Sequence, residues 1–141
     1  MINITVYLTH SLVTDELTLK GKHVIVIDAL RATSTIPAAL TNGAKEVIPT
    51  ENAATAVRVA KGSANALLCG ERGGKIIEGF NLGNSPLEYT PEVIKDKSLV
   101  FSTTNGTVSI SKAKYSKNCI IASFVNLKAI VEYLKELNED F

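Results

Sequence analysis

The sequence predicts an α/β domain with a mostly parallel sheet, flanking helices and site loops at the C-terminal ends of the strands. Short β-branched segments alternate with helix-like segments, an order typical of strands joined by right-handed crossovers. The run His23–Ile27 is continuously apolar, as expected of a strand buried on both faces of a sheet. With 141 residues, the chain fits a single domain over residues 1–141.

Six segments have the pattern of strands. Residues 1–8 alternate polar and apolar side chains, as a half-buried strand does. The other five are short runs rich in apolar residues, and they cover residues 23–27, 46–49, 66–69, 98–102 and 119–122.

Four helices are predicted between and after these strands. Pro37 is tolerated in the first turn of the first helix, and Asn52 can cap the second through its side chain. The last helix has apolar residues at the 3/4 spacing of a core-facing stripe. The four predicted helices cover residues 35–42, 53–62, 105–112 and 127–137.

The composition excludes several classes of partner. Fifteen basic and fourteen acidic residues give a net charge of +1, which argues against a nucleic-acid-binding protein. No apolar stretch is long enough for a membrane span, and the N-terminus lacks a signal-peptide pattern. Cys69 and Cys119 lack metal-ligand spacing, so we expect reduced thiols and a cytoplasmic location.

Polar residues gather where the predicted strands end. Asp28 and Arg31 follow residues 23–27, and Glu71 and Arg72 follow residues 66–69. Because ligands bind outside the carboxyl ends of parallel strands, these side chains should share one rim. Further polar groups are expected there from the end of the 98–102 strand, from the end of the last strand and from an irregular stretch: Thr103, Thr104, Asn105, Gly106, Ser123, Asn126, Asn84 and Ser85.

This rim has the chemistry of an anion site with a divalent cation. Arg31 and Arg72 are two of only three arginines, and a guanidinium fork matches phosphate, sulfonate or carboxylate oxygens. The predicted helices at residues 35–42 and 105–112 would add free backbone N–H groups. The carboxylates of Asp28, Glu71 and Glu78 could hold Mg²⁺, which in turn would bridge to a phosphate.

Each residue also has an ordinary structural interpretation. Asp28 could cap a helix or form a salt bridge with Arg31 three residues later. Glu71 and Arg72 could belong to a solvated turn, and the residues around Asn105 could be a simple helix cap. Cys69 lacks the Cys-x5-Arg spacing of cysteine phosphatases, since position 75 is Lys75.

Four linked motifs together resemble the 2-phosphosulfolactate phosphatase family. In chain order they are Asp28-Ala29-Leu30-Arg31-Ala32-Thr33, Gly70-Glu71-Arg72-Gly73-Gly74, Glu78-Gly79-Phe80-Asn81-Leu82-Gly83-Asn84-Ser85-Pro86 and Thr103-Thr104-Asn105-Gly106-Thr107. The resemblance implies Mg²⁺-dependent hydrolysis of 2-phosphosulfolactate to 3-sulfolactate and phosphate, a step of coenzyme M biosynthesis in the cytoplasm.

The resemblance also implies roles for the rim residues. Asp28 and Glu71 would be metal ligands or acid–base groups, with Glu78 a further metal ligand, and Asp28 could instead accept the phosphoryl group. Arg31 and Arg72 would clamp the phosphate or sulfonate. Neutral donors would come from the remaining motif residues: Asn84, Ser85, Thr103, Thr104, Asn105 and Gly106.

The chain is shorter than members of that family, so it resembles their N-terminal part. A missing C-terminal half would remove an acidic, glycine-containing motif and expose apolar surface, which favours self-association. Two other functions therefore remain open. One is a phosphatase for a different small organic phosphate, and the other is a non-catalytic domain that binds anions or a partner chain.

Overall fold

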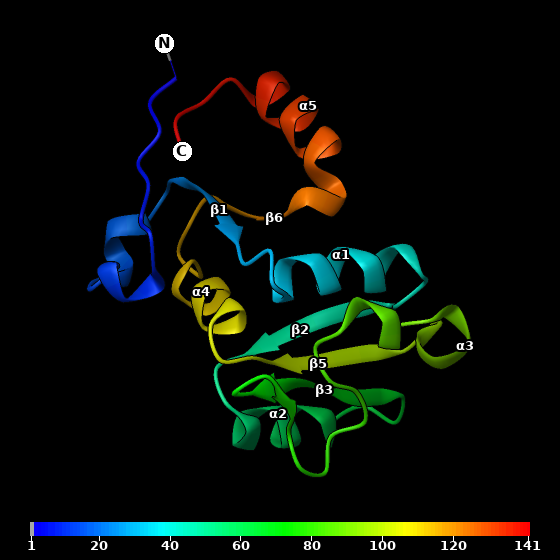
Figure 1. Cartoon of the computed structure of the whole chain (residues 1–141). Coiled ribbons are helices and arrows are strands. Elements are labelled where there is room, and N and C mark those ends of the chain that lie inside the picture. The colour runs from blue at the N-terminus through cyan, green and yellow to red at the C-terminus, as the bar shows by residue number, and fades with distance from the viewer. Residues whose placement is uncertain (1) are drawn as a thin grey trace.

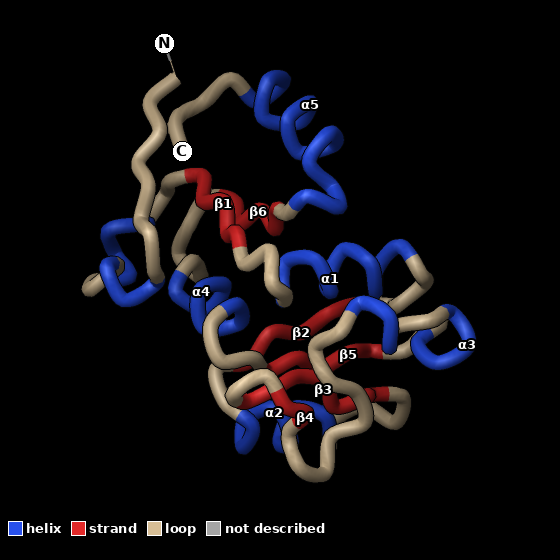
Figure 2. Tube along the Cα trace, viewed as in Figure 1, coloured by secondary structure: helices blue, strands red, loops and turns tan. Residues whose placement is uncertain are grey.

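The strands lie in two separate sheets (Figures 1 and 2), in a computed structural model that describes residues 2–141. In the smaller sheet, β1 (His23–Ile27) pairs in parallel with β6 (Asn118–Ala122). The larger sheet has the order β2-β5-β3-β4, in which the first three strands are parallel and β4 is antiparallel to β3. Its strands are β2 (Glu46–Thr50), β3 (Ala66–Arg72), β4 (Lys75–Ile76) and β5 (Ser98–Ser102). The α/β class with parallel strands is confirmed.

Two helices separate the two sheets. α1 (Ala32–Thr41) contacts β6 and β2, and α4 (Gly106–Lys112) contacts β1 and β2. α2 (Ala53–Ala60) packs on the other side of the larger sheet (Figure 1). The remaining helical segments are short or peripheral: α3 (Pro91–Ile94), α5 (Leu127–Leu137), and the 3-10 turns η1 (His10–Leu12), η2 (Glu16–Leu19), η3 (Pro86–Glu88) and η4 (Phe124–Asn126). No helix within residues 2–141 has the length and apolar character to cross a membrane.

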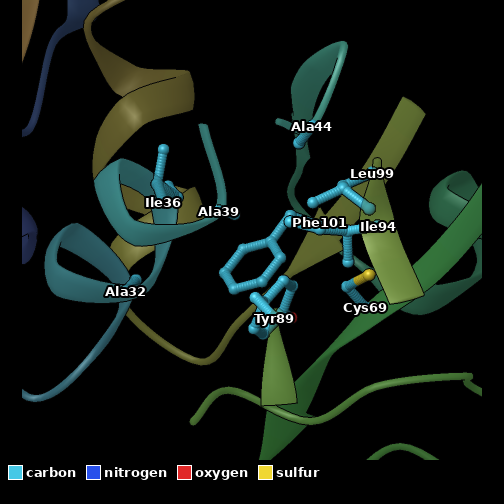
Figure 3. Packing of buried hydrophobic residues seen from close by; sticks show 9 residues of the cluster. All are labelled: Ala32, Ile36, Ala39, Ala44, Cys69, Tyr89, Ile94, Leu99 and Phe101. Atoms are coloured by element: carbon cyan, nitrogen blue, oxygen red, sulfur yellow. The ribbon is translucent and has the colours of Figure 1, made fainter. Parts of the chain in front are cut away.

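The main hydrophobic core fills the space between α1 and the larger sheet (Figure 3). The rings of Tyr89 and Phe101 lie 6.0 Å apart at 58°, a tilted arrangement that suits the charge distribution of aromatic faces and edges. Both rings are fully buried, so this contact fixes the segment before α3 against β5. The other members of the cluster are Ala32, Ile36, Ala39, Ala44, Cys69, Ile94 and Leu99.

Gly70 allows β3 to lie unusually close to β5. Its φ is +139°, and a Cβ atom there would lie 1.9 Å from the carbonyl oxygen of Ser102. A side chain is therefore excluded at this position, because neither backbone segment can move without breaking the ladder. The close approach brings Glu71, the next residue of β3, beside the loop that follows β5.

Several predicted boundaries are correct and others shift. The strands over residues 23–27 and 98–102, the helix over 127–137 and the cap by Asn52, whose Oδ1 accepts from the Thr55 N–H at 2.9 Å, are confirmed. α1 begins three residues earlier than predicted, so Pro37 lies inside it and not in its first turn. The helix starts early because Asp28 and Thr33 bond to each other across its N-terminus.

Two predictions of burial are wrong. β1 is not buried on both faces, since Ile27 is 69% exposed and only His23 and Val26 of its five residues are buried. The apolar stripe of α5 contains no buried residue. In addition, residues 2–8 do not form a strand, and Met1, the first residue of that predicted strand, lies outside the described residues.

Candidate functional site

A polar pocket of about 260 Å³ lies where the loops after β1, β3 and β5 meet. Six of the residues predicted from the sequence line it together, which are Asp28, Arg31, Glu71, Asn84, Thr104 and Asn105. Asp28 follows β1, Glu71 belongs to β3, and Thr104 and Asn105 precede α4. The loops thus converge as the strand-end rule predicts, although their strands belong to two sheets.

Glu71 joins two walls of this pocket. Its Oε1 accepts a hydrogen bond from the Thr104 N–H at 2.7 Å, and its Oε2 accepts from the Gly74 N–H at 2.8 Å and from the Thr104 hydroxyl at 3.1 Å. Burial raises the pKa of Glu71, but these hydrogen bonds and nearby Arg72 outweigh it, so the net pKa lies below its ordinary value. Glu71 is therefore a buried, ionised carboxylate and not part of a solvated turn.

Asp28 lies at the start of two helices. Burial raises the pKa of its carboxyl group, and the negative charge of Glu71 raises it further. The backbone N–H groups of Ala32 and Gly106, in the first turns of α1 and α4, act in the opposite direction without cancelling the rise. Both N–H groups therefore favour the ionised form of Asp28, and the binding of a ligand by these helix N-termini stays a prediction. Asp28 and Glu71 form a pair of carboxylates that repel each other across the pocket.

The two rim arginines have different surroundings. Arg31 lines the pocket, after a Leu30–Arg31 peptide bond that is cis, and it takes part in no salt bridge within residues 2–141. The alternative interpretation of Arg31 as a salt-bridge partner of Asp28 is therefore wrong for the described residues. Arg72 instead donates to the Glu71 carbonyl at 2.7 Å and to the Ser102 hydroxyl at 2.8 Å. Arg31 thus lines the pocket, whereas Arg72 ties β3 to β5 through the Ser102 hydroxyl.

Asn84 is held in the pocket wall by contacts on both sides. The Thr35 hydroxyl donates to its carbonyl at 3.1 Å, and the carboxylate of Glu88 accepts from the N–H groups of Gly83 at 2.7 Å and Ser85 at 3.1 Å. The Tyr89 hydroxyl donates to the Gly83 carbonyl at 2.6 Å. The backbone around Asn84 is thus fixed, while its side-chain Oδ1 is buried and has no hydrogen-bond partner within residues 2–141.

Several predicted residues lie outside the pocket lining. The Ser85 side chain belongs to the capping box of η3, and Thr103 is buried in mutual hydrogen bonds with Thr107. Gly106 packs directly behind Asp28, and Glu78 is exposed in the loop after β4. Ser123 and Asn126, at the end of β6, cap η4.

Three further residues line the pocket, Leu30, Gly73 and Gly74, which belong to the motifs quoted above but had no individual role assigned from the sequence. The two glycines form the turn between β3 and β4. The signal for their position was the paired Gly-Gly at the end of an apolar run, which is typical of a hairpin turn.

The donor set fits a magnesium ion held by two carboxylates. Mg²⁺ commonly uses one or two carboxylates and completes its shell with water and substrate oxygens. Asp28 and Glu71 supply that number, and the unpartnered Oδ1 of Asn84 could accept a hydrogen bond from a metal-bound water. Glu78 does not belong to this set, and no group of three or more His, Cys, Asp or Glu side chains suited to a metal occurs in the described residues.

Cys69 does not have the properties of a nucleophile. Its side chain is fully buried in the main core, and burial raises the pKa of its thiol to about 12. Among residues 2–141, Cys69 and Cys119 are both free, as predicted. The cytoplasmic location that we inferred from these thiols stays a prediction.

Comparison with known proteins identifies the family. A family model described as 2-phosphosulpholactate phosphatase matches residues 7–140. A probable 2-phosphosulfolactate phosphatase of Caldanaerobacter subterraneus is 45% identical over 136 residues, covering 95% of this chain and 56% of the relative. One of Thermotoga maritima is 54% identical over 111 residues, 79% of this chain and 48% of the relative. The chain thus spans about half the length of the curated relatives it matches, and it belongs to the 2-phosphosulpholactate phosphatase family.

Proposed function

We propose that the protein hydrolyses 2-phosphosulfolactate to 3-sulfolactate and phosphate with the help of Mg²⁺. The observation that carries this proposal is the joint lining of one small pocket by Asp28, Arg31, Glu71 and Asn84, in a chain of this family. Its relatives bear the name of that activity. The pocket's arginine and two carboxylates suit a compact anionic phosphate ester with a divalent cation.

Substrate binding would rest on Arg31 and on neutral donors around it. The substrate has a phosphate, a sulfonate and a carboxylate, and the planar guanidinium of Arg31 can bind two oxygens of any one of them. Asn84 and Asn105 line the same pocket, and their side-chain amides can donate to the other oxygens. Preorganised donors of this kind also stabilise charge that develops on a transferring phosphoryl group.

The two carboxylates would have unequal roles. Glu71 already accepts three hydrogen bonds, so it serves mainly to hold the pocket walls and to supply a fixed negative charge. Asp28 has fewer partners and a raised pKa, so we assign it the proton transfer or the attack on phosphorus. Both carboxylates would hold Mg²⁺, which would supply positive charge to offset that of the phosphate. Asp28→Asn should then abolish turnover, and undiminished turnover would remove Asp28 from the mechanism.

The test is phosphate release by the complete protein. The panel contains 2-phosphosulfolactate and a matched phosphorylated hydroxy acid that lacks the sulfonate, each with Mg²⁺ and with EDTA. We expect turnover of the sulfonated substrate, a preference of at least about tenfold, or 1.4 kcal/mol, over its analogue, and loss of turnover in EDTA. Equal rates would favour a phosphatase for another organic phosphate, and turnover in EDTA would contradict the role of Mg²⁺.

A second measurement addresses the alternative of a non-catalytic domain. The 141-residue chain is titrated with inorganic phosphate alongside the turnover assay on the complete protein. Phosphate binding by the chain together with an inactive complete protein would support an anion-binding domain over the phosphatase. Turnover by the complete protein would rule that alternative out.

A further inference from the structure

A second cavity, much larger than the polar pocket, runs along the free edge of β1. Its volume is about 650 Å³, and its walls are residues 4–9 of the N-terminal segment on one side and residues 24–27 of β1 on the other. Consecutive strand residues point to opposite faces, yet all of 24–27 line this cavity. The cavity therefore follows the edge of the strand and not one of its faces, and we call it the β1 groove.

The β1 groove has the features of a vacant strand position. β1 pairs only with β6, and no backbone hydrogen bond joins residues 2–9 to β1 in the described chain. The N-terminal segment is instead tied to the C-terminus, where Thr5 N donates to Phe141 O at 2.8 Å and Phe141 N donates to Asn3 O at 3.0 Å. The apolar side chains on both walls are open to solvent, with Val6, Leu8 and Ile27 exposed by 71%, 90% and 69%.

The relatives contain a second half that this chain does not match. We propose that an extended apolar segment of that half inserts into the β1 groove and pairs with β1. Main-chain hydrogen bonds to an unpaired edge give such an insertion its affinity, and the alternate side chains would bury the exposed apolar residues. A sheet of two strands is marginal in water, and the addition of a third is a common way to stabilise it.

The relatives' length supports this choice of occupant. This chain matches 56% of one relative and 48% of the other, so about half of each relative lies outside the matched region. The resemblance in the sequence places those additional residues after the C-terminal helix. Phe141 itself lines the groove (the C-terminus lies beside β1 in Figure 1), so a chain that continues past this point is already at its wall.

The groove also joins the polar pocket. Asp28 and Asn105 line both cavities, so the occupant's backbone would end beside the Asp28 carboxylate. The inserted segment would thereby complete a wall of the candidate active site. This last step rests on the proposed function, whereas binding of the segment to the groove does not.

The test is co-expression of this chain with the half of the Thermotoga maritima relative that it does not match. We expect a one-to-one complex by size-exclusion chromatography with light scattering, and increased protection of the amides of residues 24–27 in hydrogen exchange. The double variant Val6→Lys/Ile27→Lys places charge on both walls at exposed positions, so the free chain should keep its circular dichroism and melting curve. It should weaken the complex at least tenfold, whereas the control Leu87→Lys, at an exposed position outside the groove, should not.

Three results would overturn the proposal. These are the absence of a complex with the unmodified chain, equal binding by the double variant, and protection of β1 in a homodimer of this chain, which would make the occupant a second copy. Phosphate release is measured on the same samples. A complex that forms without phosphatase activity would contradict the proposed function and leave the docking surface intact.

Discussion

Glu71 accepts hydrogen bonds from both the backbone N–H and the hydroxyl of Thr104, at 2.7 and 3.1 Å. These bonds connect the end of β3 to the loop after β5, and a third, from the Gly74 N–H, connects Glu71 to the β3–β4 turn. Glu71 therefore shapes two walls of the polar pocket before any ligand binds. Its contribution to folding can be measured separately from catalysis.

Glu71→Gln should destabilise the protein in a pH-dependent way. The amide keeps one acceptor oxygen and turns a donor toward the N–H groups, which we expect to cost about 1–3 kcal/mol near pH 7. Because the pKa of Glu71 in the folded protein is below its ordinary 4.5, its stabilising effect is full above that value and is lost as pH falls through the folded pKa. Urea unfolding in EDTA should show the difference from wild type shrinking in acid. If the difference in the free energy of unfolding between Glu71→Gln and wild type did not change with pH, the charge of Glu71 would not contribute to stability.

Substitution by lysine should lower activity at Arg31 and stability at Arg72. Arg31 lines the pocket and forms no ion pair with any residue of 2–141, so Arg31→Lys should change the free energy of unfolding by less than about 0.5 kcal/mol. The same variant should lower kcat/KM of the complete protein about a hundredfold. Arg72 donates to the Glu71 carbonyl within β3 and ties β3 to β5 through Ser102, so Arg72→Lys should lower stability by about 1–3 kcal/mol. Both variants are measured by urea unfolding and by phosphate release. The prediction is wrong if Arg31→Lys unfolds at a lower urea concentration than Arg72→Lys.

Local sequence patterns predicted the bounds of single strands and helices better than the way in which the strands pair into sheets. The run His23–Ile27 has the composition of a strand, and its bounds in the structure are the predicted ones. Its burial depends on which strands lie beside it, and its partner β6 begins almost a hundred residues later, at Asn118. Pairing over that separation has no local sequence signal, so neither the division into two sheets nor the open edge of β1 could be predicted.

In the candidate site, the sequence also could not predict which single side chains face the pocket. The sequence pattern predicts a strand that ends at Cys69, with Glu71 and Arg72 in the following loop, whereas β3 continues through both. Neighbouring side chains of a strand point to opposite sides, so only one of this pair could face the pocket. The strand-end rule found Asp28 and Glu71 because it depends on chain direction alone.

Tyr89→Phe should loosen the wall that carries Asn84. The change removes the hydrogen bond of 2.6 Å to the buried Gly83 carbonyl but keeps the ring against Phe101. A buried carbonyl without a partner costs about 1–3 kcal/mol, and this loss should appear in thermal or urea unfolding. The control Tyr133→Phe alters an exposed ring on α5 and should change stability by less than about 0.5 kcal/mol. Equal stability of the two variants would mean that the Gly83 carbonyl finds water instead.

Gly106→Ala should damage the site although it improves the helix propensity of α4. In an ordinary helix this change would stabilise by about 1 kcal/mol. Here the new Cβ would lie 2.3 Å from the Ala32 Cβ and 2.6 Å from the Asp28 Oδ2. Because α1 and α4 both begin at this point, relief requires that the helices separate or that the carboxylate moves. Overpacking of this kind costs about 1–3 kcal/mol, which exceeds the gain.

The measurements for Gly106→Ala are urea unfolding and phosphate release by the complete protein. We expect a net loss of stability and a larger loss in kcat than in KM, since Asp28 would be displaced from its position beside the bound phosphate. Ser111→Ala, on the same helix and away from the pocket, should change neither quantity. A stabilised variant with normal turnover would show that α1 and α4 are less closely packed than described, and that Asp28 does not depend on their contact for its position.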